Sequence, residues 1–286
     1  MVLEHPAPIS SKPLVARDRE AVSAGPGEMV LRVAACAVCR TDLQICEGDL
    51  ASHLLPVVPG HQVVGIVEEI GPEVHGWAVG DRAGIGWLSW ACGKCAYCAS
   101  DRENLCPNAQ FTGWDVDGGY AQRVKMHADF ALRLPEAFAD IEAAPLLCGG
   151  VIGYRSLKRS GIQPGGRLGL FGFGASASLA IQVASYWGCE IYVRTRSPAE
   201  QARARALGAV WAGDYADPLP VRLQAAVTFA PVGSVVVNAL SALAPGGTVA
   251  INAIHLDHIP QFSYDLLWEE RTICSVANYT RRDARE

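Results

Sequence analysis

The chain has 286 residues, of which half are hydrophobic and 19% are charged, a composition typical of a folded globular protein long enough for two hydrophobic cores. Its net charge of −5, a pI near 5.8 and the lack of basic runs argue against a nucleic-acid partner or an anionic membrane surface. No apolar stretch is long enough to span a membrane, and the first residues do not resemble a secretion signal. We therefore expect a cytoplasmic protein with small-molecule partners.

Short β-prone runs broken by Gly, Pro and Asp characterise the first half of the chain, from Glu28 to about Ala131. Examples are MVLRVAAC at 29–36, QVVGIVEEIG at 62–71 and YAQRVKM at 120–126. Runs of this kind predict an irregular, mostly antiparallel sheet.

Four cysteines lie within this half in the run CGKCAYCASDRENLC, at Cys92, Cys95, Cys98 and Cys106. Their spacing predicts a closed tetrahedral site of four thiolates, for which zinc is the usual ion and whose role is structural. An iron–sulfur cluster is a weaker alternative, because Pro107 follows the last cysteine as in ferredoxins but the spacing is wider. Disulfides are the other alternative, although ten cysteines without a signal peptide fit a reducing compartment better.

The pattern changes near residue 165, where apolar strands begin to alternate with helical stretches. The strands are RLGLFG at 167–172, EIYV at 190–193, AAVTFA at 225–230 and GTVAINA at 247–253, and the helices fall at 178–187 and 198–208. Such alternation predicts a parallel sheet in an α/β domain. We expect the boundary between Pro145 and Gly165, which gives domains at 1–150 and 151–286.

A glycine-rich turn follows the first strand of the second half, in the run GFGASA. Gly172 and Gly174 permit a tight turn and the close approach of a pyrophosphate, and Ala177 stands where a small residue lets helix and strand pack. Glycine pairs after strands are common, but the strand before this turn and the helix after it favour dinucleotide binding.

The residues after the second strand, in EIYVRTRSP, favour NADP over NAD. Thr195 occupies the position where an acidic residue binds the ribose 2′-hydroxyl of NAD, and Arg196 follows it. A 2′-phosphate would meet a hydroxyl and a cation there. The alternative is that Arg194 and Arg196 are solvated loop charges.

Three further residues, Cys39, His61 and Cys148, provide two thiolates and an imidazole, the ligand set of a catalytic zinc with an open fourth position. Considered one at a time, a cysteine or histidine of this kind is more often a core or surface residue without a ligand role.

The ordered motifs CRTDLQ, PGHQVVG, GDR, CGKCAYCASDRENLC, DGGYA, LLCGGVIGY and GFGASA resemble the zinc-containing alcohol dehydrogenases of the medium-chain dehydrogenase/reductase family. The resemblance runs from about Glu28 to the C-terminus. It implies a mostly-β, GroES-like catalytic domain at 1–150 and a Rossmann-type, doubly wound parallel sheet at 151–286. It also implies a homo-oligomer, either a dimer or a tetramer.

The resemblance assigns roles to individual residues. Cys39, His61 and Cys148 would bind the catalytic zinc and the four clustered cysteines the structural zinc, which makes two ions per chain. Arg40 would reach the cofactor pyrophosphate, Thr41 would bond the alcohol oxygen, and Asp42 would orient His61. Trp87 and Trp114 would line the substrate pocket, unless they only pack the lobe, and they would favour unbranched primary alcohols.

Several positions depart from the family pattern. Gln62 stands where relatives carry glutamate, and Gln44 where a histidine often ends the proton relay, with His53 as a possible substitute. His255 and His258 are expected to be loop residues. Relatives usually continue beyond SVANYTRRD with strands and a helix, so the C-terminal return segment is expected to be truncated.

The sequence therefore predicts a zinc-dependent alcohol dehydrogenase that interconverts primary alcohols and aldehydes with NADP in preference to NAD. Alternative functions are a dehydrogenase of secondary alcohols or polyols, and an inactive nucleotide-binding zinc protein.

Overall fold

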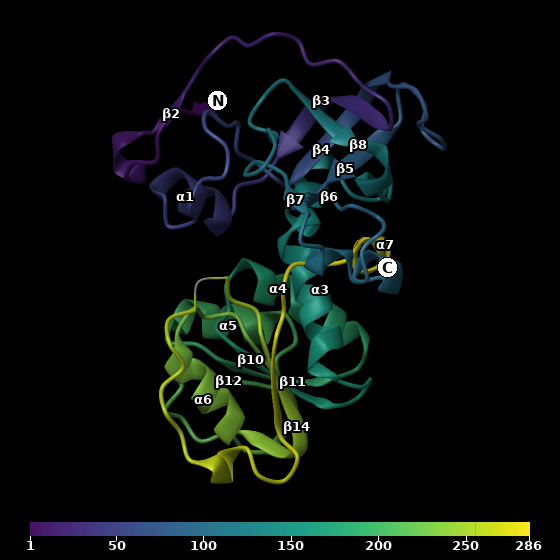
Figure 1. Ribbon diagram of the computed structural model, residues 1–286. Helices are drawn as coiled ribbons and strands as arrows, with labels where there is room; N and C mark the ends of the chain where they lie inside the picture. Colours follow the sequence, from purple (N-terminus) through teal and green to yellow (C-terminus); the bar gives the residue numbers. More distant parts are fainter. Residues whose placement is uncertain (255) are drawn as a thin grey trace. The chain divides into compact units, whose positions relative to one another are not determined.

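The structure is a computed structural model that describes residues 1–254 and 256–286, so the prediction for His255 lies outside the described residues. The chain forms two compact units. One comprises Met1–Cys148 together with Asn278–Glu286, and the other comprises Gly149–Ala277 (Figure 1).

The first unit is built on a five-stranded antiparallel sheet in the order β8-β3-β4-β5-β9. Apolar side chains from β3, β4 and β8 meet on one face of this sheet, and Met29, Leu31 and Val63 among them are fully buried. The strands are β3 (Glu28–Cys36), β4 (Val63–Ile70), β5 (Arg82–Ile85), β8 (Arg123–His127) and β9 (Leu132–Arg133).

Smaller elements complete the first unit. Two short antiparallel pairs are β1 (Val2–Leu3) with β2 (Leu14–Val15), and β6 (Leu88–Trp90) with β7 (Gln110–Phe111). The second pair flanks the segment that carries the four clustered cysteines. The helices of this unit are α1 (Arg40–Glu47), α2 (Asp140–Ala143) and α7 (Arg281–Arg285).

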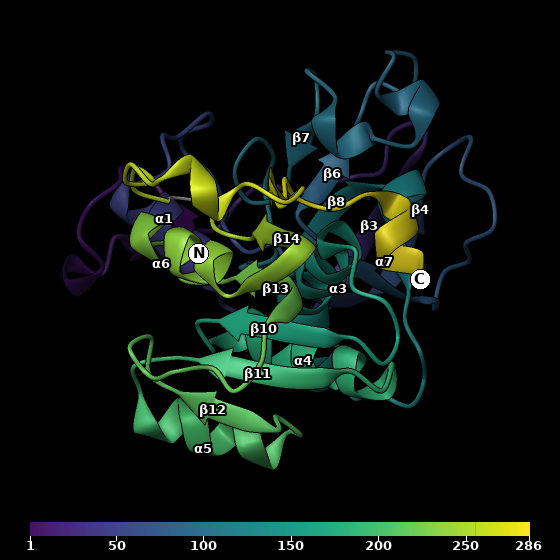
Figure 2. The same cartoon turned by 90° about the horizontal axis from the view of Figure 1, so that it is seen from below.

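The second unit contains six parallel strands in the order β12-β11-β10-β13-β14-β15, several of which lie side by side in Figure 2. The strands are β10 (Arg167–Phe171), β11 (Glu190–Arg194), β12 (Trp211–Gly213), β13 (Leu223–Thr228), β14 (Leu243–Ile251) and β15 (Thr272–Ser275). The helices are α3 (Gly149–Ser160), α4 (Ala175–Tyr186), α5 (Pro198–Ala206) and α6 (Gly233–Ser241).

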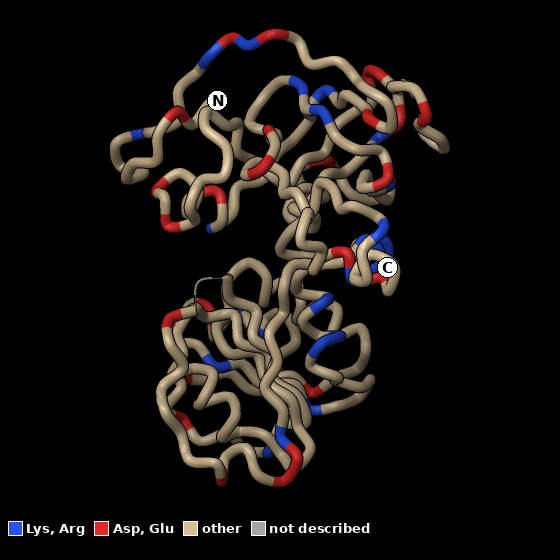
Figure 3. The backbone as a smooth tube through the Cα atoms, viewed as in Figure 1, with Lys and Arg blue, Asp and Glu red and all other residues tan. Residues whose placement is uncertain are grey.

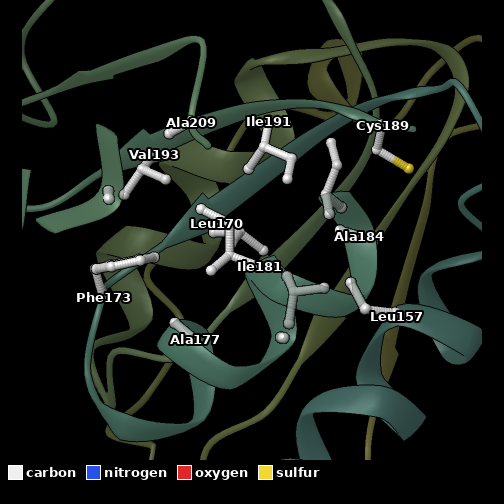
Figure 4. Packing of buried hydrophobic residues seen from close by; sticks show 14 of the residues in the cluster. Leu157, Leu170, Phe173, Ala177, Ile181, Ala184, Cys189, Ile191, Val193 and Ala209 are labelled. Atoms are coloured by element: carbon white, nitrogen blue, oxygen red, sulfur yellow. The ribbon is translucent and has the colours of Figure 1, made fainter. Parts of the chain in front are cut away.

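Alternate residues of each strand point to opposite sides of this parallel sheet, and helices cover both of its faces. On one face Leu170 and Val193 pack with Ile181 of α4 and with residues of α3 and α5 (Figure 4). On the other face Phe171 and Val249 pack with residues of α6. The sheet is thus doubly wound, and the predicted fold class is confirmed.

Charged residues of both signs are scattered along the backbone of each unit (Figure 3). Within the described residues, no helix has both the length and the apolar character needed to cross a bilayer.

One segment does not follow the predicted boundary at 151–286. The structure groups Asn278–Glu286 with the first unit, in which Tyr279 and Asp283 of the short helix α7 are buried. The Leu88 amide donates a hydrogen bond to the Tyr279 hydroxyl at 3.2 Å, and Arg281 contacts the buried Glu103 carboxylate at 3.3 Å. These contacts join residues that are far apart in the chain, so no local sequence pattern predicts them.

Candidate metal centres and dinucleotide site

The first candidate centre lies within the first unit, where Cys39, His61 and Cys148 converge. Cys39 lies just before α1, His61 precedes β4, and Cys148 follows a 3-10 turn after α2. Their two sulfur atoms and one ring nitrogen all lie within 4.8 Å of one another. Three residues that are far apart in sequence therefore present the donor set of a metal ion with one open coordination position.

The start of α1 fixes the position of Cys39. Its sulfur accepts a hydrogen bond from the Thr41 amide at 3.3 Å, and the Asp42 carboxylate accepts one from the Cys39 amide at 2.8 Å. This is a capping box with a sulfur in place of the usual hydroxyl. The order Cys-x-x-Asp at the start of an amphipathic helix is a local signal for this cap that the predictions above do not include.

Asp42 also holds His61 in a defined orientation. The other carboxylate oxygen lies 3.0 Å from Nδ1 of His61, and Nε2 lies 3.3 Å from the Cys39 sulfur. Both side chains are almost completely buried. The pairing fixes the tautomer, because an Nδ1 hydrogen donated to Asp42 leaves Nε2 with a lone pair for a metal ion.

The electrostatics of the group favour a cation at its centre. A hydrogen bond from Cys148, helped by His61, lowers the pKa of Cys39 to about 4 against the effect of burial. The same contact, together with burial, raises the pKa of Cys148 well above its usual value. Burial alone would lower the pKa of His61, but its partners Asp42 and Cys39 raise it to about 10. The protons held here would be displaced when a metal ion binds.

The second candidate centre is formed by the clustered cysteines Cys92, Cys95, Cys98 and Cys106, whose sulfur atoms lie within 4.8 Å of one another. The Cys95–Cys98 sulfur distance is 3.5 Å and the Cys92–Cys98 distance is 4.0 Å. These values exclude disulfide bonds, which need about 2 Å. They match the edge of a tetrahedron with zinc–sulfur bonds of about 2.3 Å, which is about 3.8 Å. A single ion fits this set better than an iron–sulfur cluster, whose cysteine ligands stand further apart.

A cluster of aromatic rings lies beside His61 of the first centre. The Trp87 ring meets the His61 ring edge-on at 4.9 Å, and it stacks with Phe111 at 5.2 Å and Trp114 at 5.8 Å. Both tryptophans also pack against buried apolar residues. His53 stacks on Trp114 at 3.8 Å and lies 2.7 Å from the Asp115 carboxylate.

The remaining residues expected near this centre differ in exposure. Thr41 is buried, whereas Arg40, the first residue of α1, is exposed. The buried Gln62 amide donates to the Ala37 carbonyl at 3.3 Å. Sequence reasoning assigned no role to Tyr120, although its motif was recognised. Burial, followed by the negative charge of Asp42, raises the pKa of the Tyr120 phenol, which therefore stays protonated.

The glycine-rich turn of the second unit joins β10 to α4. Gly172 has φ +88°, and a Cβ there would lie 2.9 Å from the Ala230 amide nitrogen, so this position requires glycine. Gly174 precedes α4, and a Cβ there would meet no atom within 4 Å. Open space next to the first amides of α4 suits a pyrophosphate. Ala177 is fully buried under this turn.

The structure at the end of β11 contradicts one alternative left open by the sequence, that Arg194 is a solvated loop residue. Arg194 is not a solvated loop charge, because it is 8% exposed and donates to the Asn238 side chain at 2.6 Å and the Asp217 carbonyl at 2.5 Å. Burial lowers its pKa. Arg196 is exposed, and among the described residues it has no ion pair. Thr195 is 4% exposed.

Comparison with known proteins places the chain in a family. Residues 25–136 match the family profile described as the alcohol dehydrogenase GroES-like domain. The chain is 50% identical over 289 residues to a probable alcohol dehydrogenase of Mycobacterium tuberculosis (strain CDC 1551 / Oshkosh), in an alignment that covers 99% of this chain and 84% of that protein.

Two solved structures share the fold. A cinnamyl alcohol dehydrogenase from Sorghum bicolor superposes with a TM-score of 0.87 at 26% identity, covering 93% of this chain and 80% of that one. A protein described as a zinc-binding dehydrogenase from Sinorhizobium meliloti 1021, bound to NADP, gives a TM-score of 0.86 at 26% identity and covers 94% and 83%. With the geometry above, these matches show that the chain belongs to the zinc-containing alcohol dehydrogenases of the medium-chain dehydrogenase/reductase family.

Proposed function

We propose that this protein is a zinc-dependent dehydrogenase that transfers a hydride reversibly between a primary alcohol and a nicotinamide dinucleotide, with NADP favoured. The observation that carries the proposal is the convergence of Cys39, His61 and Cys148. In this assignment they hold a catalytic zinc, and the four clustered cysteines hold a second, structural zinc. Both donor sets fit the ion, because thiolate and imidazole are the ligands zinc prefers.

In the proposed reaction, the zinc ion and the protein side chains have different chemical roles. Bound zinc supplies a Lewis acid that polarises an alcohol or carbonyl oxygen. Asp42 keeps His61 in the tautomer that a metal requires and increases its basicity. The hydroxyl of Thr41, which is buried beside the ligand Cys39, would accept the alcohol proton while its own hydrogen passes to a ribose hydroxyl of the dinucleotide or to water. The rings of Trp87 and Trp114 would exclude water from the pocket and restrict the shape of the alcohol.

We assign the dinucleotide site to the turn between β10 and α4. Gly172, Gly174 and the first amides of α4 would hold the pyrophosphate, while Ala177 keeps helix and strand close. The predicted contact of Arg40 with the pyrophosphate also belongs to this proposal. NADP preference rests on the exposed Arg196 guanidinium and on the lack of an acidic residue at position 195.

The test is a matrix of initial rates with ethanol, butanol, benzyl alcohol, cinnamyl alcohol, isopropanol and a polyol, each with NAD and with NADP. We expect the highest kcat/KM with a primary alcohol and NADP, and we expect Arg196→Ala to lose most of the NADP preference. Highest activity with isopropanol or the polyol would contradict the primary-alcohol assignment. No oxidation of any alcohol by the zinc-loaded protein would show an inactive nucleotide-binding protein. The cytoplasmic location and the homo-oligomeric state remain predictions.

A further inference from the structure

A carboxylate occupies the end of β11, close to the residues on which NADP preference depends. The Thr195 hydroxyl donates a hydrogen bond to Oε2 of Glu200 at 2.5 Å. Glu200 comes from the first turn of α5, five residues further along the chain.

The local sequence would allow another arrangement of Glu200. Ser197 precedes α5, and its hydroxyl accepts a hydrogen bond from the Glu200 amide at 3.3 Å, which is the first half of a capping box. A glutamate at this position usually completes the box by turning back to the serine amide. Here its carboxylate contacts Thr195 instead, and the Gln201 side chain donates to the Thr195 carbonyl at 2.8 Å. Two residues of α5 thus hold Thr195 in place.

This contact changes what Thr195 can offer a ligand. A threonine hydroxyl has a single hydrogen to donate, and that hydrogen is directed to Glu200. A 2′-phosphate at this position would therefore receive no hydrogen bond from Thr195 and would face a negative charge. A ribose 2′-hydroxyl would instead find a carboxylate that can accept its hydrogen.

Opposite charges meet in this region. Burial raises the pKa of Tyr215, the positive charge of Arg196 lowers it, and the negative charges of Glu200 and Asp214 raise it, so all three side chains act on the same phenol. Glu200 is partly exposed and can reach a ligand, and Arg196 is exposed. The region therefore presents a cation that attracts a phosphate and carboxylates that repel it, and Glu200 is the carboxylate bonded to Thr195.

We propose that Glu200 is a second specificity-determining residue of the dinucleotide site, which accepts the ribose 2′-hydroxyl of NAD and opposes the preference for NADP that Arg196 creates. The inference rests on the proposed dinucleotide site of the second unit. In this proposal the enzyme uses both dinucleotides, and the opposing effects of Arg196 and Glu200 on the 2′-phosphate determine which one it prefers.

The test is calorimetric titration of the zinc-loaded protein with NADP, NAD, adenosine 2′,5′-bisphosphate and 5′-AMP. Glu200→Gln removes the charge at nearly constant shape, and Glu200→Ala also frees the Thr195 hydroxyl. We expect both variants to bind NADP and the bisphosphate roughly tenfold more tightly relative to NAD and AMP, as removal of one nearby like charge predicts.

The matched control is Glu190→Gln, which removes the same charge from the opposite end of β11, where the carboxylate accepts from the Tyr192 hydroxyl at 3.1 Å. Its ratio of NADP to NAD affinity should stay within about twofold of the wild type, because charges that far apart are screened. If the ratio of NADP to NAD affinity were the same in Glu200→Gln, Glu200→Ala and Glu190→Gln, the role of Glu200 would be overturned while the dinucleotide site would stand. Failure of the wild type to bind either dinucleotide would overturn the site itself, and the role of Glu200 with it.

Discussion

Thr41 is the residue whose proposed role can be separated most cleanly from binding. Its amide supports the Cys39 sulfur, whereas only its hydroxyl is assigned to the alcohol proton. We expect Thr41→Ala to keep the amide contact and lower kcat by about a hundredfold, with the dissociation constant for NADP unchanged within about twofold. Thr41→Ser, which retains a hydroxyl, should recover most of the rate. Full activity in Thr41→Ala would remove this residue from the relay.

At the residue scale, the sequence was most informative where ligand spacing or a motif restricts the geometry. The four clustered cysteines lie within one short run, so their spacing alone predicted a compact set. The family resemblance was needed to group Cys39, His61 and Cys148. No local sequence pattern shows that a helix cap, a loop and a turn come together in space. The environments of Arg194 and Glu200 could not be predicted, because the direction of a long side chain depends on partners such as Asn238 that come from other elements.

Among the elements, the segment between β6 and β7 has few apolar residues and depends on its cysteines. We expect Cys95→Ser to bind one zinc per chain in place of two and to lower the unfolding midpoint by at least about 5 °C, because structural metal binding is coupled to folding. Metal analysis and thermal unfolding measure both effects. Cys189→Ser is the control, since this buried cysteine belongs to the other unit, where it packs in an apolar cluster and its thiol donates to the Gln163 carbonyl. A Cys95→Ser protein with two zinc ions and an unchanged midpoint would contradict the assignment.

The last residues of the chain form an element whose stabilising contact can be tested. The Tyr279 hydroxyl accepts from the Leu88 amide at 3.2 Å, and the ring is buried. Tyr279→Phe should leave this buried amide without its partner and lower the free energy of unfolding by about 1 to 3 kcal/mol. Urea unfolding measures the change. Tyr186→Phe, at a ring that is 90% exposed, should change stability by less than about 0.5 kcal/mol. Equal stability of the two variants would show that the hydroxyl contributes nothing.

The longer strands of both sheets could be read from the sequence because apolar runs ended at turn residues. β3, β4 and β8 have this character in the first unit, and β10, β11, β13 and β14 have it in the second. The helix α1 was not predicted, because it has only eight residues and its cap uses a cysteine. The helix α6 was also missed, because its run of valines resembles a strand.

At the scale of the whole molecule, the change from short β-prone runs to alternating strands and helices predicted two folded units. The boundary was predicted between Pro145 and Gly165 because a helix and a Gly-rich turn are visible there, and α3 is the helix that lies in this range. The grouping of Asn278–Glu286 with the first unit was not predicted. It depends on the distant partners Leu88 and Glu103, which no periodicity reveals.

The central claim is that Cys39, His61 and Cys148 hold a zinc ion on which alcohol oxidation depends. It is tested most directly by measuring zinc per chain and alcohol-dependent NADP reduction on the same samples of wild type and Cys148→Ala. We expect two zinc ions and activity in the wild type, and one zinc ion with no detectable activity in the variant, which still binds NADP. A wild type that is active with one zinc ion, or a Cys148→Ala protein that oxidises alcohols at the wild-type rate, would contradict it.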